Sequence, residues 1–211
     1  MSVYEDLSIL VQQGRMANVK EIIAAELEKG TNPKDLLQNG LLAGMAVVGD
    51  KFKNNQVYVP EVLIAARAMQ AGIDALAVAL SSEKTESRGT VVLGTVKGDL
   101  HDIGKNLVKI MLESKGLEVI DLGVDVSAEK FVQTAVDKNA KVIACSALLT
   151  TTMSVMKEVV DLVSERGLKG KIKVMVGGAP VTDDFRSKIG ADYYTADASS
   201  ASDVALSICQ S

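Results

Sequence analysis

The second half of the chain alternates short, β-branched apolar runs with longer amphipathic segments. The apolar runs, which predict strands, cover residues 90–96, 117–121, 141–146, 172–176 and 192–195. The amphipathic segments, which predict helices, cover residues 103–115, 127–138, 152–166, 181–189 and 199–209. Strands that are joined by helices form parallel sheets with helices on both faces. We therefore expect an α/β domain with a flavodoxin-like, five-stranded parallel sheet in the order 2-1-3-4-5.

The first half of the chain carries helical signals only. An apolar stripe at helical spacing includes Val19 and Ile23, and Gly30 follows it as a stop signal. Pro33 and Pro60 each stand at the start of a further stripe, where proline favours the first turn of a helix. Because such helices bury their apolar faces in pairs, we expect an N-terminal four-helix bundle.

A polar stretch at residues 81–89 separates the two halves of the chain. It carries no large apolar side chain, so it is expected to be solvated and to act as an interdomain linker. The expected domains are therefore a helical domain at residues 1–88 and an α/β domain at residues 89–211.

Charge and composition argue against several kinds of partner. The net charge is -4 and aromatic residues make up 3% of the chain, so a nucleic-acid partner, which needs a basic face, is not expected. No continuous apolar run approaches the roughly 20 residues that cross a bilayer. The N-terminus has no signal-peptide pattern, and we expect a cytoplasmic protein without a membrane partner. Cys145 and Cys209 are expected to be buried thiols and not a disulfide.

The single histidine of the chain, His101, follows the first predicted strand of the α/β half. It stands in the loop sequence Gly98-Asp99-Leu100-His101-Asp102-Ile103-Gly104. Sheets of this class bind ligands at the carboxyl ends of their strands, and imidazole is the most common protein ligand of metals. The carboxylate of Asp99 can orient the ring. With one His and two distant Cys, a structural zinc site is excluded, so a transition metal must bring most of its own ligands.

Two other interpretations of this loop fail on the sequence. A phosphate-binding P-loop has four residues between its glycines, whereas five residues separate Gly98 from Gly104. A response-regulator receiver needs an aspartate at the end of its third strand, where this chain has Cys145-Ser146-Ala147-Leu148. Neither a nucleotide site nor a phosphorylated aspartate is therefore expected.

Three elements at successive strand ends resemble the signature of cobalamin-binding domains. They are Asp99-x-His101-x-x-Gly104, Ser146-x-Leu148 and Gly177-Gly178, which match the pattern DxHxxG…SxL…GG. The first half is similar to the helical cap that precedes this domain in methionine synthase, on the segments 40–45, 48–52 and 58–62. The whole chain resembles the corrinoid proteins of methyltransferase systems that serve methylamines, methanol, betaines or aryl methyl ethers.

The resemblance implies cobalamin or a related corrinoid as the cofactor, with His101 as the metal ligand on the lower face of cobalt. The corrin ring supplies the equatorial nitrogens, so one protein ligand suffices. Asp99 would accept the second imidazole N–H, and the hydroxyl of Thr152 would either bond to Asp99 or act as a helix N-cap. The remaining cofactor-binding candidates are Asp102, Ile103, Gly104, Ser146, Leu148, Thr150, Gly177, Gly178, Tyr58 and Met69.

Several of these candidates have a distinct expected role. Ser146 and Leu148 are expected to line the slot for the displaced nucleotide base. The pair Gly177-Gly178 would let the nucleotide tail approach the backbone, because glycine has no Cβ. In the cap, Tyr58 and Met69 are expected over the upper face of the ring, where they would exclude water.

The resemblance further implies a methyl carrier and not a complete enzyme. Cob(I)alamin would accept a methyl group from a substrate:corrinoid methyltransferase. The resulting methylcob(III)alamin would deliver it to a second methyltransferase that uses tetrahydrofolate or coenzyme M, and a reductive activase is the third implied partner. One alternative is a cobalamin-dependent sensor or regulator, although light-sensing relatives place a Trp in the cap and this chain has none. Another is a mutase subunit, but such subunits usually lack the helical cap.

Overall fold

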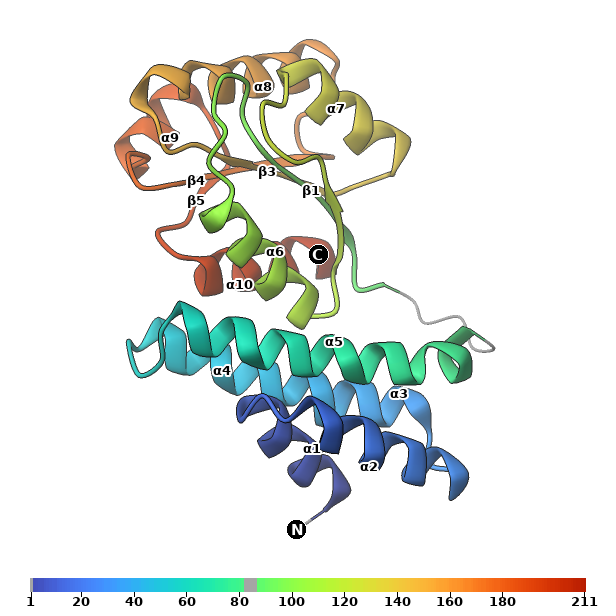
Figure 1. Cartoon of the computed structure of the whole chain (residues 1–211). Coiled ribbons are helices and arrows are strands. Elements are labelled where there is room, and N and C mark those ends of the chain that lie inside the picture. Colours follow the sequence, from blue (N-terminus) through green and yellow to red (C-terminus); the bar gives the residue numbers. More distant parts are fainter. Residues whose placement is uncertain (1, 82–86) are drawn as a thin grey trace. The chain divides into compact units, whose positions relative to one another are not determined.

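The chain consists of two compact units, Met1–Glu86 and Ser87–Ser211 (Figure 1). The computed structural model describes residues 2–81 and 87–211. The predicted linker at 81–89 spans the division between the units, and its central residues 82–86 lie outside the described part of the chain. The division falls close to the expected boundary between residues 88 and 89.

The second unit is built on a five-stranded, fully parallel sheet in the order β2-β1-β3-β4-β5. The predicted fold class and strand order are therefore confirmed. The strand register places Val92 of β1 opposite Ile120 of β2 on one side and Ile143 of β3 on the other. The strands are β1 (Thr90–Thr95), β2 (Glu118–Asp121), β3 (Val142–Ser146), β4 (Lys173–Gly177) and β5 (Tyr193–Tyr194).

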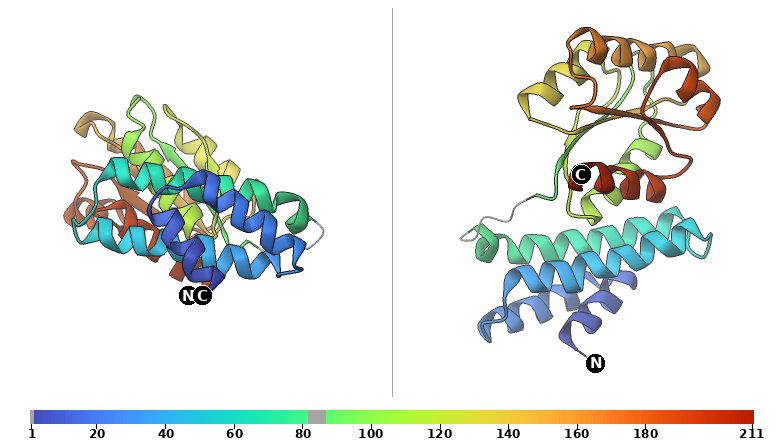
Figure 2. Two further views of the ribbon diagram at one scale, coloured as in Figure 1. Left: turned by 60° about the horizontal axis from the view of Figure 1, so that its bottom comes forward. Right: turned by 180° about the vertical axis from the view of Figure 1, so that it is seen from behind.

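Helices cover both faces of this sheet, as the two sets of views show (Figures 1 and 2). One face carries α7 (Ala128–Asp137), α8 (Ser154–Glu165) and α9 (Asp183–Ile189), and the other carries α6 (Ile103–Ser114) and α10 (Ala198–Gln210). Side chains of a strand point alternately to its two faces, and β1 follows this rule. Val92 packs with Phe131 of α7, whereas Val91 and Leu93 pack in the cluster of Leu112 from α6.

Over residues 2–81 the first unit contains four helical stretches, which agrees with the expected bundle. They are α1 (Val3–Gln12), α2 (Met16–Glu28), the continuous run α3 (Pro33–Asp35), η1 (Leu36–Leu42) and α4 (Ala43–Lys53), and α5 (Val59–Ser81). The segment η1 is a π-helix inside the third stretch. The first stretch begins with a capping box, in which the Glu5 N–H donates to Ser2 Oγ and the Ser2 N–H donates to Glu5 Oε2.

Two glycines one turn apart let α1 pack closely against the third helical stretch. A Cβ added at Gly40 would lie 2.9 Å from Leu7 Cδ1, and one added at Gly44 would lie 2.8 Å from the Ser8 carbonyl oxygen. Both distances are shorter than a normal van der Waals contact. The absence of side chains at these two positions is therefore what allows the α1 backbone to approach.

Helix α5 is apolar along much of its length, although Arg67 and Asp74 interrupt it and no continuous apolar run in it approaches 20 residues. Its segment Val59–Ala79, of 21 residues, contains an 18-residue window with a mean hydropathy of 1.5, so by length and composition alone it is long and apolar enough to cross a membrane. A Cβ added at Gly72 would lie 2.7 Å from Leu41 and 3.0 Å from Val19, so α5 uses its apolar face to pack against other helices of the unit.

An ion pair between a buried lysine and a partly buried aspartate connects α6 to the edge strand β2. Lys105 is 2% exposed, and its Nζ donates to both carboxylate oxygens of Asp121 at 2.7 and 2.8 Å. Partial burial tends to raise the pKa of Asp121, but hydrogen bonds from Lys105 and from the Gly123 N–H outweigh it and lower the pKa. The ammonium is the more deeply buried partner, with a side-chain exposure of 3% against 21% for the carboxylate.

This difference in burial predicts that substitutions of Asp121 and of Lys105 lower the free energy of unfolding by different amounts. Asp121→Ala leaves a buried cation without its carboxylate and should lower the free energy of unfolding by about 3–5 kcal/mol. Lys105→Met leaves a partly exposed carboxylate that keeps the Gly123 N–H, and should cost about 1–2 kcal/mol. Urea unfolding measures both, with Asp161→Ala at an exposed ion pair as a control that should cost less than about 1 kcal/mol. A larger loss of stability in Lys105→Met than in Asp121→Ala would contradict this account.

Candidate functional site

The three sequence elements at the strand ends meet at one edge of the sheet. Thr95 at the end of β1 pairs with Ser146 at the end of β3, and Ser146 pairs with Gly177 at the end of β4. The loop that carries Asp99 and His101 follows β1 directly. Because all strands are parallel, their carboxyl ends share this edge, and β1 and β3 flank the point where the chain direction across the sheet reverses.

The imidazole ring of His101 is oriented by Asp99. The distance between His101 Nδ1 and Asp99 Oδ1 is 2.7 Å, and the histidine side chain is 52% exposed. An ionised carboxylate can only accept hydrogen bonds, so Nδ1 must carry the proton. In the neutral ring Nε2 is then unprotonated, with a lone pair that is free to bind a metal.

Asp99 is fully buried, at 0% exposure, and is held by several donors. Its Oδ2 accepts the N–H groups of Leu148 at 2.7 Å and Leu149 at 3.0 Å, and its Oδ1 accepts the His101 N–H at 3.1 Å. Burial by itself raises the pKa of this carboxyl, but these hydrogen bonds and that of the His101 ring outweigh it and hold the pKa well below its usual range. Asp99 is therefore ionised at neutral pH.

Thr152 reaches the same carboxylate. Its Oγ1 lies 3.2 Å from Asp99 Oδ2 and 2.9 Å from the Leu149 carbonyl oxygen, so its proton has two acceptors within reach. It ends a short 3₁₀ turn, η2 (Thr150–Thr152), and the N-cap position of α8 is Met153, which makes no side-chain cap bond. Of the two alternatives for Thr152, the structure thus has the contact with Asp99 and not the N-cap. Thr150 is exposed in the same turn.

Large apolar side chains stand exposed on both loops beside His101. Leu100 and Ile103 are 71% and 77% exposed, and Leu148 and Leu149 are 45% and 41% exposed. Exposed apolar side chains that cluster in this way mark a binding surface. Leu149 is absent from the sequence-based candidates, although its position directly after Leu148 in a strand-end loop could have indicated it.

The other candidates in the α/β unit have simpler environments. Asp102 Oδ2 accepts a hydrogen bond from Asn106 Nδ2 at 3.1 Å, at the start of α6. Gly104 faces open space, since a Cβ there would meet no atom within 4 Å. Ser146 is partly buried, and its hydroxyl makes no hydrogen bond with any residue that the structure describes.

Of the glycine pair at the end of β4, Gly178 is required by the fold itself. Gly178 has φ +131°, and a Cβ there would lie 1.9 Å from the Ala147 carbonyl oxygen. A Cβ at Gly177 would lie 3.3 Å from the Thr195 carbonyl oxygen. The missing side chain of Gly178 thus admits the neighbouring loop after β3, which is a different reason from the ligand approach that the sequence suggests.

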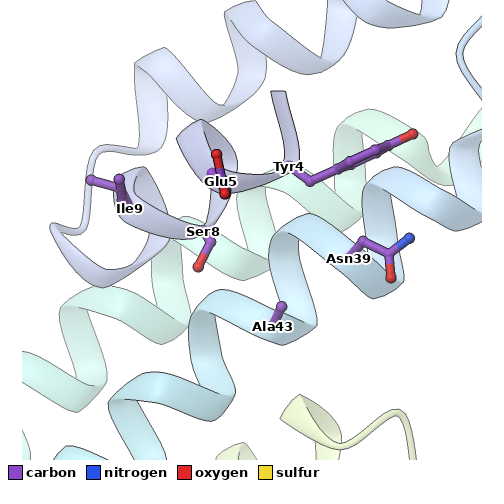
Figure 3. A pocket seen from close by; sticks show the side chains of 6 residues that line it. All are labelled: Tyr4, Glu5, Ser8, Ile9, Asn39 and Ala43. Carbon is purple, nitrogen blue, oxygen red and sulfur yellow. The ribbon is translucent and has the colours of Figure 1, made fainter. Parts of the chain in front are cut away.

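Two candidates and one hollow belong to the helical unit. Tyr58 is 66% exposed just before α5, and Met69 is 3% exposed on that helix, so their expected contact with a cofactor stays a prediction. A hollow of about 480 Å³ lies between α1 and the third helical stretch (Figure 3). None of its lining residues is a predicted site residue, and the Glu5 carboxylate there already accepts the Ser2 N–H. The lining residues are Tyr4, Glu5, Ser8, Ile9, Asn39 and Ala43.

The fold and this site define a B12-binding protein. A family model described as a B12 binding domain matches residues 89–204, and a second model of the same description matches residues 3–77. Dimethylamine corrinoid protein 1 of Methanosarcina mazei is 42% identical over 205 residues, which cover 95% of each chain. Trimethylamine corrinoid protein 1 of the same organism is 44% identical over 176 residues, 82% of each chain. The chain belongs to the corrinoid proteins of methyltransferase systems, and its cofactor is a corrinoid.

Solved structures agree with this assignment. The methanol:cobalamin methyltransferase complex MtaBC from Methanosarcina barkeri contains a chain that matches with a TM-score of 0.89 and 34% identity, over 98% of this chain and 79% of that one. A cobalamin-binding protein from Desulfitobacterium hafniense matches with a TM-score of 0.81 and 28% identity, over 99% and 98% of the two chains.

The lowered pKa of Asp99 predicts an acid-sensitive contribution to stability. A carboxyl whose folded pKa lies below its unfolded value, about 3.9, stabilises the fold above that value, and this contribution is lost as the pH falls toward the folded pKa. Asp99→Asn should therefore lower the free energy of unfolding at pH 7 by about 2 kcal/mol or more, and by much less near pH 2. Chemical denaturation at the two pH values measures the difference. Asp102→Asn, at an exposed carboxyl, should show no such pH-dependent difference, and an equal effect of Asp99→Asn at both pH values would refute the prediction.

The backbone of Gly178 predicts a strong effect of a single methyl group. Gly178→Ala forces a Cβ onto the Ala147 carbonyl oxygen in a backbone conformation that L-residues avoid, and should lower the free energy of unfolding by about 2 kcal/mol or more. Gly104→Ala adds the same methyl group in open space and should change it by less than about 1 kcal/mol. Urea unfolding of the cofactor-free variants compares them, and equal stabilities would show that the close approach is unimportant.

Proposed function

We propose that this chain is the methyl carrier of a corrinoid-dependent methyltransferase system, with His101 as the axial ligand of cobalt. The observation that supports this most strongly is the 2.7 Å hydrogen bond between His101 Nδ1 and the buried carboxylate of Asp99. It presents the unprotonated Nε2 of a half-exposed ring at the edge of the sheet where ligands bind. When bound, the corrinoid supplies the metal centre that accepts a methyl group and gives it up again.

The donor set fits a metal that arrives with most of its ligands. His101 is the single histidine of the chain, and residues 2–81 and 87–211 contain no group of three or more His, Cys, Asp or Glu side chains that could hold a metal ion. A bare transition-metal ion would thus lack ligands here. A corrinoid would bring most of the metal's ligands with it, so His101 Nε2 would suffice as the protein ligand, and the exposed Leu100, Ile103 and Leu148 would offer it apolar surface.

The Asp99 side chain determines which nitrogen of the His101 ring carries the proton. Asp99 stays ionised and holds the imidazole proton at Nδ1, which makes Nε2 the better donor to a metal. The Thr152 hydroxyl lies 3.2 Å from Asp99 Oδ2, which is the carboxylate oxygen that the His101 ring does not contact, and can donate to it. Because Nε2 is the ring nitrogen that is left unprotonated, a metal and a second proton would compete for it.

Partners are inferred from the relatives. Their names concern dimethylamine, trimethylamine and methanol, and the two methylamine proteins match over most of their length. We therefore propose a substrate:corrinoid methyltransferase that uses a methylated amine as the methyl donor. A second methyltransferase would pass the group to tetrahydrofolate or coenzyme M, and a reductive activase would restore the active cofactor, all in the cytoplasm.

Replacing the histidine tests the ligand directly. His101→Ala should fold normally, with a change in the free energy of unfolding below about 1 kcal/mol, because the side chain is half-exposed. The reconstituted variant should lose the visible spectrum of histidine-ligated cobalt. In the electron paramagnetic resonance signal of its Co(II) form it should also lose the splitting from the histidine nitrogen, which labelling the histidine of the chain with nitrogen-15 distinguishes from the splitting of the cofactor's own base. Lys97→Ala, an exposed change in the same loop, should keep both signals. Spectra of His101→Ala that match those of the unmodified protein would disprove the assignment.

Methyl transfer itself is tested with the loaded chain and purified partner methyltransferases. The reduced holoprotein should become methylated with a methylated amine only when a cognate methyltransferase is present. A holoprotein that retains adenosylcobalamin, or whose oligomeric state changes on illumination, would instead indicate a mutase subunit or a light sensor.

A further inference from the structure

The loop that carries Asp99 and His101 is held at its backbone by a residue from the segment between β2 and α7. Asp125 Oδ1 accepts a hydrogen bond from the Gly98 N–H at 2.7 Å. The N–H of Asp125 donates to the Asp99 carbonyl oxygen at 3.1 Å. The two bonds enclose the Gly98–Asp99 dipeptide, so one residue fixes both ends of the turn that leads to His101.

The backbone of Asp125 is itself fixed in an uncommon conformation. Its φ is +55°, in the left-handed region that most non-glycine residues avoid. On either side, the Val126 N–H donates to the Thr95 carbonyl oxygen at 3.0 Å and the Gly123 carbonyl accepts from the Thr95 N–H at 2.9 Å. Hydrogen bonds to β1 on either side therefore hold Asp125 in this left-handed conformation. Backbone conformations of this uncommon kind cluster at functional sites, where the surrounding structure maintains them.

The loop is also held after Gly98, where the Thr95 hydroxyl donates to the His101 carbonyl oxygen at 2.9 Å and the Asp99 N–H donates to the Val96 carbonyl oxygen at 3.1 Å. Among the described residues, however, the Gly98 N–H is bonded by Asp125 alone. Gly98 has φ +82° and no side chain, and Leu100 and His101 are exposed. On its far side, the Asp99 carboxylate is already fixed by the N–H groups of Leu148 and Leu149. A rotation of the backbone at Gly98 would therefore pull Asp99 from these donors and turn the His101 ring with it.

We propose that Asp125 is a positioning residue for His101. It fixes the backbone of Gly98 and Asp99, and through the Asp99 carboxylate it sets the direction in which Nε2 of His101 points. This inference rests on the proposed function, in which that nitrogen binds cobalt. The hydrogen bonds of Asp125 to this loop go to the backbone of Gly98 and Asp99 and not to the imidazole ring or the Asp99 carboxylate, so its effect is indirect.

Three substitutions at this position separate the side-chain bond from the backbone conformation. Asp125→Asn keeps an oxygen that can accept the Gly98 N–H, and asparagine tolerates the left-handed region. Asp125→Gly keeps the left-handed conformation but removes the acceptor. Asp125→Ala removes both. Asp137→Ala, at an exposed aspartate of α7 that bonds to Gln133, removes the same charge elsewhere and serves as the control.

The first measurement uses the cofactor-free chain. In Asp125→Ala and Asp125→Gly the Gly98 amide should exchange with solvent about ten-fold faster or more, as expected for the loss of a hydrogen bond to a charged acceptor. The ring signals of His101 in nuclear magnetic resonance spectra should shift toward those of a less restrained imidazole. Asp125→Asn and Asp137→Ala should match the unmodified chain in both measurements.

The second measurement uses the reconstituted chain in its Co(II) form. The fraction of cobalt with histidine bound should fall in Asp125→Ala and Asp125→Gly and be kept in Asp125→Asn. Unchanged Gly98 exchange and unchanged His101 signals in the glycine variant would overturn the positioning role, even if the alanine variant did not fold. If His101→Ala retained the spectrum of the unmodified holoprotein, the cobalt ligand would be wrong, while the cofactor-free measurements would still decide whether Asp125 positions the loop.

Discussion

The carboxylate of Asp99 carries a full charge with no exposed surface, and much of the α/β unit is arranged so that this charge is stable. An unpaired buried carboxylate would take up a proton, because burial disfavours the charged form. Donors from two loops prevent this: the His101 N–H and ring come from the loop after β1, and the N–H groups of Leu148 and Leu149 from the loop after β3. Both loops can reach one carboxylate only if β1 and β3 are neighbours, which the order β2-β1-β3 provides. The strand order is thus a condition for the buried charge.

Backbone conformations that ordinary residues avoid complete the arrangement. Gly98 and Asp125 have positive φ values, and together they shape the turn before Asp99. Gly178 also has a positive φ, and it lets the loop after β4 pass within contact of Ala147, at the start of the loop that supplies the N–H donors. Each of these positions adjusts a loop and not a strand. The strands are regular, and these unusual backbone conformations lie in the loops at the edge of the sheet that holds the Asp99 carboxylate.

The sequence was sufficient to predict the strand order and to bring Asp99, Ser146 and Gly177 to one edge, because parallel strands align their carboxyl ends and side-chain periodicity is local. It did not indicate that backbone N–H groups of Leu148 and Leu149 bind Asp99, since every residue carries such a group and only the fold selects which ones converge. Asp125 was missed for the same reason: its role depends on a left-handed conformation that its residue type permits but does not impose.

In the helical unit the sequence predicted helices but not their details. Helix α1 carries an apolar stripe that includes the buried Leu7 and Val11, begins with a capping box at Ser2 and packs closely at Gly40 and Gly44. Helix α5 combines a high mean hydropathy with no uninterrupted apolar run, because Arg67 and Asp74 divide its apolar residues. The close packing at Gly40 and Gly44 was not predicted, because it depends on shape at small residues, and shape is not visible in a hydrophobic pattern.

With Asp99 buried and His101 half-exposed, the proposed site would bind a ligand without burying a further charged group. The carboxylate is dehydrated when the chain folds, and its hydrogen bonds are formed at the same time, so no charged group has to leave water when a ligand arrives. What remains exposed is one imidazole nitrogen and the apolar side chains of Leu100, Ile103 and Leu148. Covering these groups releases water from apolar surface and removes a neutral acceptor from solvent, which costs far less than burying an ion. A preorganised site of this kind loses little free energy to ordering on binding, because the proton on Nδ1 and the direction of the ring are set before the ligand arrives.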